Sequence, residues 1–582
     1  MRMTQTKFKL NQKAVFGLMV LAAIGAAPVH AATLAANPLA PDGLVDGLCS
    51  LREAVIQINT GADSADCVNS SADAYGTNDT ITLAAGTYNL TVTGLDESAT
   101  GTAPTFTVVN TPDTTIGDID IMKSVRIVGT AGADATIIQW DTTVLNANRD
   151  RIFHVYTTAV ATVNVTIEGV TIQGGRTFEQ LLATGAPSGD AADPALYDYY
   201  FRRAGGGLAV GAAANVAKVN PLLVGSENAA GRGGSRRPGE SEPAGPTFSL
   251  TLTGVKVLAN QAEGDGAGIY TGSPMTATSV LVSGNTSTVN GGGVYNEGNT
   301  SITNSTISGN RAEGGGGLFL TGSNTVGITG TTLSGNRAVG GGAISSRADV
   351  TINMLNSTIS GNLGDDVGAG FYSNGPGSLR FVTIANNIAG ADAATAGAGI
   401  NVFPSGAVTV ALKNVLLAAN KKGWDPVAEP NGPADPAALP SANCGYTGSA
   451  MAIISNGNNL SSDTSCTTLT QPTDKTNVDP LIGALASNGG PTQTHALLSG
   501  SPALSAGAAE AGVTVDQRGQ PREAPPDIGA FELDNIVEGG DGGGGGGGGC
   551  AVGGDGRFDP ILPALLAAGL GFFGWRRFKA GK

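Results

Sequence analysis

The chain has few aromatic residues, few charged residues and only three histidines. Aromatic residues make up 5% and charged residues 14% of its 582 residues, and the formal net charge is −15 at pH 7. A chain this acidic is a poor candidate for binding nucleic acid or anionic membrane surfaces, which need basic patches. The 89 glycines follow no Gly-X-Y period, which excludes collagen. The sequence also lacks Gly-x-Ser-x-Gly, zinc-protease and phosphate-loop motifs.

The N-terminus has the layout of a secretory signal peptide. Four cations precede the apolar run AVFGLMVLAAIGAA, and small residues Val29 and Ala31 stand where a signal peptidase reads. The alternative is a membrane anchor, but the run is too short to span a bilayer. We therefore predict that residues 1–31 are removed and that the chain is exported from Ala32 onward.

Export determines how the five cysteines are interpreted. In an oxidising compartment, the economical pairing joins Cys49 to Cys67 and Cys444 to Cys466. Each disulfide would close a loop of about 20 residues and contribute roughly 3 kcal/mol in the chain-entropy model. The alternative, metal ligation, lacks CxxC spacing and nearby histidines. Cys550 is left without a partner.

The middle of the chain repeats with a period of about 25 residues, which signals a solenoid. Each unit ends in an asparagine, and an aliphatic residue stands three positions before it. The asparagines are Asn260, Asn285, Asn310, Asn336, Asn362, Asn387 and Asn420, and the aliphatic residues are Val257, Val282, Ile307, Leu333, Ile359, Ile384 and Leu417. Period-2 patches such as SITNSTIS, with their Val, Ile and Thr content, indicate strands.

These patterns predict an all-β, right-handed parallel β-helix, since parallel crossovers are overwhelmingly right-handed. The aliphatic series would form an interior ladder, and glycine clusters such as GGGVY would form tight corners. The asparagine series would form a corner ladder; the alternative is a polar rail that faces a ligand. Arg311 and Arg337 follow consecutive ladder asparagines, so they form either a small acid-binding spot or two solvated cations.

The coils extend less regularly towards the N-terminus. Residues 32–175 are predicted to form an N-terminal cap and the first coils, and residues 247–430 the regular coils. Residues 176–246 are rich in Ala, Gly, Pro and Arg, so we interpret them as an irregular, partly disordered insertion with one coil fragment, GGGLAV.

Two end motifs resemble known families of exported bacterial proteins. DGLCSLREAVIQIN resembles the CSLREA motif at the start of many exported β-helix proteins, and its Leu51, Ala54, Val55 and Ile58 have helical spacing. A short amphipathic helix here would cap the first coil, whose edges and core would otherwise be exposed. The resemblance implies a pectin-lyase-like solenoid.

Residues 479–532 closely resemble the choice-of-anchor Q domain, through NGGPTQTHALLSGSPALSAG, DQRG and DIGAFE. Ser505 departs from the Asp usual in that family. The resemblance implies a loop-rich C-terminal cap, which we place at residues 431–536, followed by a cell-surface sorting signal; it implies no reaction. The polar residues of the cap have two interpretations, a catalytic group or a buried network that holds the loops, and we favour the network. These residues are His495, Asp516, Arg518, Asp527 and Glu532.

The chain ends in a glycine-rich linker (537–550), a short apolar run and a basic terminus (551–582). This tail resembles tripartite bacterial sorting signals, and its Cys and FDPxLP look nearest to the JDVT-CTERM type. The resemblance implies processing near Cys550 by a sorting protease; the alternative is a plain membrane anchor with a short transmembrane helix. The residues that carry the signal are Cys550, Asp559, Pro560, Arg576 and Arg577.

A catalytic set is not recognisable in the coils. Glycoside hydrolysis needs two carboxyl groups across a groove, but Asp265 has no counterpart on the next coil, and Asp365 and Asp366 are only weak candidates. We expect no cofactor or metal, with Ca²⁺ a weak possibility. The sequence therefore favours a non-catalytic, envelope-anchored surface protein with an adhesion, glycan-contact or matrix role, whose partners are a sorting protease, the envelope membrane and a polysaccharide. The alternative is a polysaccharide lyase or glycoside hydrolase that uses a groove on the β-helix flank.

Overall fold

The computed structural model describes residues 31–43, 46–71, 73–93, 99–102, 105–108, 115–146, 149–156, 161–177, 205–210, 247–390, 397–403, 409–446 and 452–533. Three predictions lie largely or wholly outside these residues: the signal peptide, most of the 176–246 insertion, and the tail with Cys550, Asp559, Pro560, Arg576 and Arg577. No helix among the described residues has the length and apolar character needed to span a membrane.

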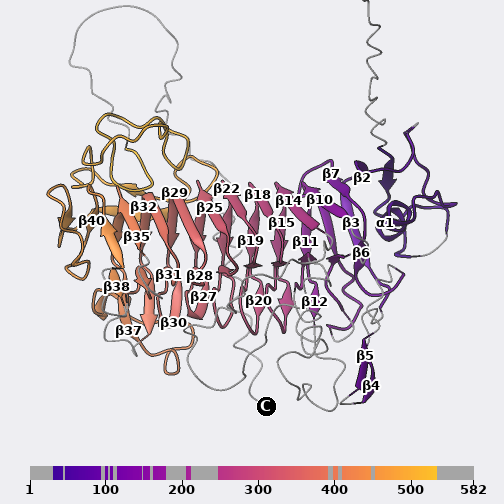
Figure 1. Ribbon diagram of the computed structural model, residues 1–582, viewed down its shortest axis with the longest axis horizontal. Coiled ribbons are helices and arrows are strands. Elements are labelled where there is room, and N and C mark those ends of the chain that lie inside the picture. The colour runs from indigo at the N-terminus through magenta and orange to yellow at the C-terminus, as the bar shows by residue number, and fades with distance from the viewer. Residues whose placement is uncertain are drawn as a thin grey trace, which may run out of the picture. The chain divides into compact units, whose positions relative to one another are not determined.

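The described chain winds into a right-handed parallel β-helix, as predicted (Figure 1). Its main sheet contains β1 (Thr33–Ala36), β2 (Asp79–Leu83), β3 (Gly86–Leu90), β7 (Val125–Gly129), β8 (Thr136–Trp140), β10 (Thr162–Glu168), β11 (Thr171–Gln173), β14 (Thr247–Thr253), β15 (Lys256–Leu258), β18 (Met275–Thr278), β19 (Leu281–Ser283), β22 (Thr300–Thr303), β23 (Thr306–Ser308), β25 (Thr325–Thr329), β26 (Thr332–Ser334), β29 (Thr351–Ser360), β32 (Gly377–Ala385), β35 (Val410–Lys413), β36 (Leu416–Ala418), β39 (Ile453–Ser455), β40 (Leu460–Ser461) and β41 (Lys475–Thr476).

A second sheet runs along another side of the coils. It contains β6 (Ile119–Ile121), β9 (Phe153–Val155), β13 (Leu208–Val210), β17 (Ile269–Thr271), β21 (Val294–Asn296), β24 (Leu318–Leu320), β28 (Ile344–Ser346), β31 (Phe371–Ser373), β34 (Ile400–Val402) and β38 (Cys444–Tyr446). Strand β13, from the predicted GGGLAV coil fragment, pairs with β9 and β17.

Short strands form the third side of the coils. They are β12 (Arg176–Thr177), β16 (Gln261–Ala262), β20 (Thr286–Ser287), β27 (Arg337–Gly340), β30 (Leu363–Val367), β33 (Ile388–Gly390) and β37 (Lys421–Trp424). Two antiparallel pairs lie outside these stacks, β4 (Ala99–Thr102) with β5 (Thr105–Val108) and β42 (Ile482–Ala486) with β43 (Thr494–Leu497), and a 3₁₀ turn covers Pro436–Ala438.

The repeated aliphatic residues form the predicted interior ladder. Val257 pairs with Val282, which pairs with Ile307, and all seven members of the series are at most 3% exposed. Burying a side chain of this size stabilises the fold by about 1.5–3 kcal/mol. The glycine clusters lie at the corner before the second sheet: Gly291 has φ of 65°, and a Cβ on Gly293 would lie 2.6 Å from the carbonyl oxygen of Gly317. Only glycine therefore allows the coils to stack this closely at that corner.

The predicted asparagine ladder lies inside another corner. Each side-chain amide donates to the side-chain oxygen of the asparagine on the next coil, at 2.8–3.0 Å, from Asn260 through Asn420. Every member is at most 1% exposed. A ligand cannot reach side chains buried to this degree, so the ladder supports the corner and does not form a ligand-facing rail.

The helix α1 (Leu51–Thr60) caps the N-terminal coil. Ser50 and Glu53 form a capping box, Gly61 ends the helix with φ of 73°, and the predicted apolar face enters the core. The buried Arg52 extends from this helix to Asp42, at 2.8 Å, and to the backbone oxygens of Gly117 and Asp118. The helix is therefore attached to the first coils by both apolar and ionic contacts.

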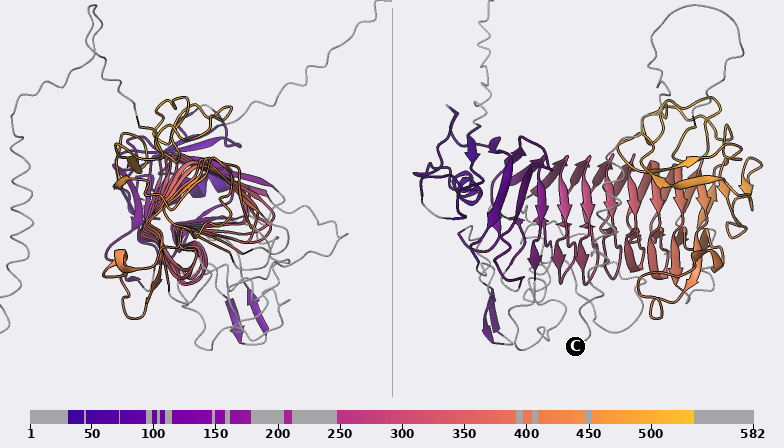
Figure 2. Two further views of the ribbon diagram at one scale, coloured as in Figure 1. Left: turned by 90° about the vertical axis from the view of Figure 1, so that its left-hand side faces the viewer. Right: turned by 180° about the vertical axis from the view of Figure 1, so that it is seen from behind.

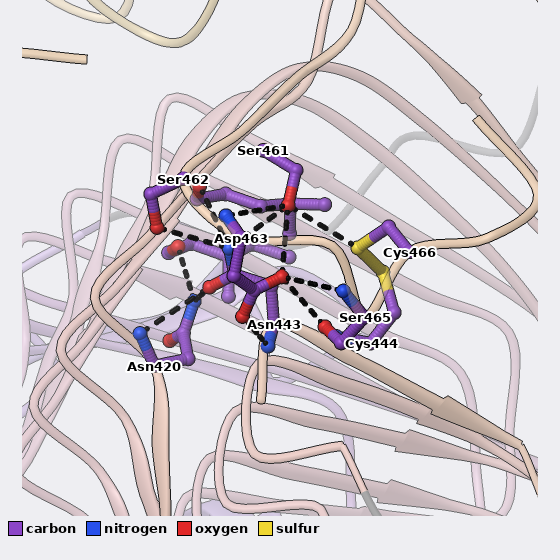
Figure 3. Close-up of a disulfide and its surroundings, with 10 residues drawn as sticks. Asn420, Asn443, Cys444, Ser461, Ser462, Asp463, Ser465 and Cys466 are labelled. Atoms are coloured by element: carbon purple, nitrogen blue, oxygen red, sulfur yellow. Dashed lines mark hydrogen bonds between the residues drawn. A yellow bond between two sulfur atoms is a disulfide. The ribbon is translucent and has the colours of Figure 1, made fainter. Parts of the chain in front are cut away.

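Both predicted disulfides are present, Cys49–Cys67 and Cys444–Cys466. The second lies where the asparagine ladder ends (Figure 3). There Asn420 donates to Asn443, a ladder member that the repeat pattern did not predict, and Asn443 donates its backbone N–H to Asp463. Cys466 and Leu469 belong to the core, so the loop after β40 covers the last coil.

The loop-rich segment 479–533 lies along a flank of the coils and does not cover their end. Figure 2 shows these yellow loops on one side of the stacked strands. Gln517 bonds to Thr332 and Thr358, and the backbone N–H of Ala530 donates to Thr383. The outward hydroxyl groups of β26, β29 and β32 are thus hydrogen-bonded to the loop-rich segment 479–533.

Candidate functional site

The two acidic residues suggested by the sequence lie on β30. Asp365 forms an ion pair with Arg337, with a distance of 2.7 Å between Oδ1 and Nε, and the Arg337 guanidinium lies 4.9 Å from the centre of the Trp424 ring. Burial raises the pKa of the Tyr372 phenol, and the charge of nearby Asp366 adds to this shift. Arg311 is exposed on the preceding coil, in the bridge position beside Arg337, so the two arginines stack on adjacent coils as expected and Arg337 already engages Asp365.

Four of the five polar residues of the C-terminal segment, Asp516, Arg518, Asp527 and Glu532, form a linked and largely buried network. Asp516 accepts bonds from Arg518 and from the backbone of Glu532, and Asp527 accepts from the backbone of Ser505. These bonds satisfy loop backbone groups that have no strand partner, which is the structural role that we predicted. Ser505 has φ of 47° and uses its backbone N–H to bind Asp527.

His495 belongs to the same segment. It is 2% exposed, with Nε2 2.8 Å from Ser360 Oγ and Nδ1 2.7 Å from the Gly483 carbonyl. Burial lowers the pKa of His495, so the neutral ring is favoured. This histidine therefore holds the segment to β29 and is not open to a substrate.

A regular array of hydroxyl groups covers the outside of the main sheet. Thr251, Thr276 and Ser301 pair in register on β14, β18 and β22, and their neighbours Leu252, Ala277 and Ile302 point into the core. We name this surface the hydroxyl face and define it as Thr251, Thr253, Thr276, Thr278, Ser301 and Thr303, all at least partly exposed. Its rows repeat about every 4.8 Å along the coils.

The hydroxyl face borders a shallow hollow of about 480 Å³. Its lining is Ser249, Leu250, Thr251, Pro274, Met275, Thr276, Asn299, Thr300, Ser301 and Thr325. This volume lies within the range of ligand pockets, about 300–1,000 Å³. The lining includes hydroxyl and amide groups and no charged side chain, so it suits a neutral ligand that offers many hydroxyl groups.

A second group of polar side chains lies on the outside of the second sheet. We name Asp265, Asn290, Tyr295 and Glu297 the acid–tyrosine cluster. Asp265 Oδ1 accepts hydrogen bonds from both the backbone N–H and the side-chain amide of Asn290, at 3.0 and 3.1 Å. The Tyr295 phenol donates to Glu297 Oε1 at 3.1 Å. Asp265, Tyr295 and Glu297 are half-buried, so solvent still reaches them.

The environment shifts the pKa values in this cluster. Burial, followed by the charge of Glu297, raises the pKa of Asp265 to about 6, and the bonds from Asn290 oppose the shift. Burial also raises the pKa of Glu297, while the bond from Tyr295 lowers it. Two nearby carboxyl groups with different partners are a pattern of acid–base sites. Asp265 is visible in the sequence as an isolated acid of the coils, whereas Glu297 gives no signal there, because it lies at the other end of the strand on the next coil.

Aromatic rings stack beside this cluster. The ring centres of Tyr270 and Tyr295 are 5.2 Å apart and those of Tyr295 and Phe319 are 5.4 Å apart, with nearly parallel planes. The Arg347 guanidinium lies 5.2 Å from the Phe319 ring centre and is close enough to lower the pKa of Asp265. One cation therefore accompanies the two carboxyl groups.

Within the part of the chain that the structure describes, Asp118, Asp120 and His154 have the donors for a metal ion. Their ligand atoms lie within 4.8 Å of one another, and all three are buried. Arg151 Nε lies 2.8 Å from Asp118 Oδ2, and His154 Nδ1 lies 3.0 Å from Asp120 Oδ1. Each carboxylate thus also faces a basic side chain, and Arg52 of the capping helix contacts the Asp118 backbone.

Comparison with known proteins agrees with the fold. Residues 246–426 match the model of the family described as right handed beta helix region. The structure of pectate lyase Pel9A shares 11% identity at a TM-score of 0.42, covering 88% of this chain and 98% of that one. The A-module of the Azotobacter vinelandii mannuronan C-5 epimerase AlgE6 shares 13% identity at a TM-score of 0.28, covering 72% and 97%. No curated protein matches the chain.

Proposed function

We propose that this protein is an exported, envelope-anchored β-helix protein that contacts glycans through its hydroxyl face, in adhesion or in building an extracellular matrix. The register of Thr251, Thr276 and Ser301 carries the proposal. Hydroxyl groups that repeat at a constant distance from coil to coil suit a polymer that itself offers hydroxyl groups at regular intervals. Contact through hydroxyl groups needs no acid or base, so the contact itself is non-catalytic.

A second feature supports this choice. The outward hydroxyls of β26, β29 and β32 bind the polar C-terminal segment, through Thr332, Thr358 and Thr383. Strands β14, β18 and β22 have similar outward hydroxyls, and these remain at the surface. The molecule thus holds a polar chain through a neighbouring row of outward hydroxyls, which is in register with β23 and not with β22.

Binding to polysaccharides tests the proposal. The full-length protein is mixed with insoluble cellulose, chitin and xylan and with soluble pectate and alginate, and bound protein is measured. We expect binding to a neutral polymer, and at least tenfold weaker binding for Thr251→Asp/Thr276→Asp because these changes add charge to the face. Glu313→Gln, an exposed change on another side of the coil, is the control. Equal binding by the double variant and the control would contradict the role of the face.

Anchoring is tested separately by mass spectrometry of the mature protein. We expect a new N-terminus at Ala32 and a C-terminus near Cys550, after removal of the signal peptide and processing of the tail. An intact Lys582 would refute processing and favour the plain membrane anchor.

The alternative, a carbohydrate-active enzyme, is favoured by one observation, the two carboxyl groups of the acid–tyrosine cluster. Asp365 and Asp366 are tested by incubating the full-length protein with a panel of polysaccharides and measuring the products. Loss of an observed activity in Asp365→Asn/Asp366→Asn would assign the chemistry to β30.

A further inference from the structure

Asp118, Asp120 and His154 form a compact group of donors on one side of the second sheet. Strands β6 and β9 pair so that Asp120 stands directly beside His154. Because neighbouring residues such as Ile121 and Val155 enter the core, the paired acid and histidine point away from it. Asp118 lies two residues before Asp120 and shares that side. The three side chains are nevertheless at most 1% exposed, so two carboxylates and an imidazole are enclosed together.

The spacing of these donors suits a metal ion. One ligand atom from each residue lies within 4.8 Å of the other two, and His154 Nδ1 lies 3.0 Å from Asp120 Oδ1. A transition-metal ion held about 2.0–2.2 Å from each ligand separates its ligand atoms by at most about 4.4 Å. Small shifts of the side chains therefore suffice to bring all three donors to one ion.

Asp120 lacks the hydrogen bonds that a buried carboxylate needs. Within the described residues, neither of its side-chain oxygens accepts a hydrogen bond, although the residue is 0% exposed. The 3.0 Å contact with His154 Nδ1 is therefore close but is not aligned as a hydrogen bond. A buried charge is costly unless it is paired and hydrogen-bonded or coordinates a metal. Two ligands of one ion have this arrangement, since each directs a lone pair at the ion and not at the other ligand.

The charges around the group also favour a cation. Arg151 Nε lies 2.8 Å from Asp118 Oδ2 and 3.7 Å from Asp150 Oδ1, so its single charge is already shared between two carboxylates. The charge of Asp120 needs another partner. A protonated His154 would offer Asp120 a hydrogen bond, but their contact is not aligned as one. An imidazole among the donors favours a transition metal such as Zn²⁺ over Ca²⁺ or Mg²⁺, which prefer oxygen ligands.

We propose that Asp118, Asp120 and His154 bind a divalent transition-metal ion of the Zn²⁺ class in a structural site that joins the capping helix to the first coils. Arg52 of helix α1 donates to the backbone oxygen of Asp118, and Asn59 donates to that of Asp120. The ion thus fixes the strand to which the helix is attached. Water completes the coordination, because three protein ligands leave at least one position open. This site goes beyond the proposed glycan contact and does not depend on it.

Metal analysis of the full-length protein tests the site. The protein is produced in medium depleted of transition metals and in medium supplemented with Zn²⁺, and the bound metal is measured by elemental mass spectrometry. We expect one Zn²⁺ per chain after supplementation. Asp120→Asn and His154→Gln should weaken Zn²⁺ binding by more than the 10–100-fold, roughly, that loss of an outer-shell partner costs. His495→Gln, which changes another buried histidine, is the control and should keep the full metal content.

The parent protein alone gives a second test, which stays valid if a variant does not fold. Zn²⁺ should raise the melting temperature of the metal-depleted parent and slow hydrogen exchange in α1 and β6, because an ion that binds only the folded chain stabilises it; Mg²⁺ should do neither. Absence of bound Zn²⁺ in the parent, preference for Ca²⁺, or an equal metal content in the parent, Asp120→Asn and His154→Gln would overturn the site. A metal-free parent whose melting temperature is unaffected by Zn²⁺ would indicate that a protonated His154 compensates Asp120.

Discussion

Asn443 donates its backbone N–H to Oδ2 of Asp463, at a distance of 2.9 Å, and this bond ends the asparagine ladder. Each earlier asparagine gives its backbone N–H and its side-chain amide to the next member, so the amides all point one way along the coils. Asn443 has no further asparagine to receive its bonds. Asp463 and the hydroxyls of Ser461 and Ser462 take that place (Figure 3).

Removing the terminal acceptor should destabilise the C-terminal coils. In Asp463→Ala, the buried N–H of Asn443 loses its acceptor, and Ser465 loses two bonds to Oδ1. A buried donor left without a partner costs about 1–3 kcal/mol, so we expect a lower melting temperature and faster hydrogen exchange in β38 and β40. Ser462→Ala is the milder control, because it removes one of the two hydroxyl acceptors of the Asn443 amide and the acceptor of the exposed Ala419 N–H. Equal melting temperatures for all three proteins would contradict the terminal role of Asp463.

A substitution within the asparagine ladder should destabilise the protein more than a substitution at the end of the ladder. Asn336 accepts two bonds from Asn310 and donates to Ile307 and Asn362. Asn336→Ala leaves two buried donors and two buried acceptors each with one partner fewer. A typical unsatisfied buried group lowers the free energy of unfolding by about 1–3 kcal/mol. We expect a drop in melting temperature larger than that of Asp463→Ala. Ser308→Ala, on the preceding coil and only part-buried, should change it little.

The coil architecture could be predicted because each coil repeats the same physical constraint. Val257, Val282 and Ile307 recur because the interior needs an aliphatic side chain at one position per coil, and the asparagines recur because one corner needs the same bond. Asn443 escaped prediction because it precedes β38 and does not follow the strand motif of the other members.

The acid–tyrosine cluster could not be found by comparing equivalent positions. The residue that occupies the place of Asp265 on the next coil is Asn290, and the place of Glu297 on the preceding coil is taken by Gly272. The two acids lie in a corner turn and at a strand end, and neither place has a periodic signal in the sequence. The lateral packing of Gln517 on Thr332 likewise joins segments that share no pattern in the sequence.

The N-terminal cap offers a comparison of a buried and an exposed ion pair. Arg52 is fully buried against Asp42, whereas Arg126 pairs with Glu168 and keeps 48% of its side chain exposed. Removing one partner of a buried pair costs about 3–5 kcal/mol, since the other charge stays buried without compensation. An exposed pair contributes about 0–1 kcal/mol. We therefore expect Arg52→Gln to lower the melting temperature strongly and Arg126→Gln to change it slightly; similar shifts would show that Arg52 does not hold the cap.

Reduction of the first disulfide should act on the same cap. The Cys49–Cys67 bond encloses helix α1 with a sequence separation of 18 residues. The chain-entropy model gives about 3 kcal/mol for a loop of this size. In Cys49→Ala/Cys67→Ala, we expect faster hydrogen exchange in α1 and β1 and unchanged exchange in β29, which lies far along the coils. Uniform acceleration along all coils would instead indicate that the cap and the central coils unfold as one unit.

Acidification should weaken the attachment of the C-terminal segment through His495. Burial holds the pKa of His495 below its ordinary value of 6.5, so the unfolded chain binds a proton that the folded chain resists. The contribution of this residue to the free energy of unfolding is therefore full above pH 6.5 and falls as the pH drops below it. Carboxyl groups with raised pKa values, such as Asp527, act in the opposite direction but are present in every variant. In His495→Asn, which has no titrating ring, the deficit in melting temperature relative to the parent should be largest near pH 8 and shrink towards pH 5. A deficit that stays constant over this range would mean that His495 titrates alike in the folded and unfolded states.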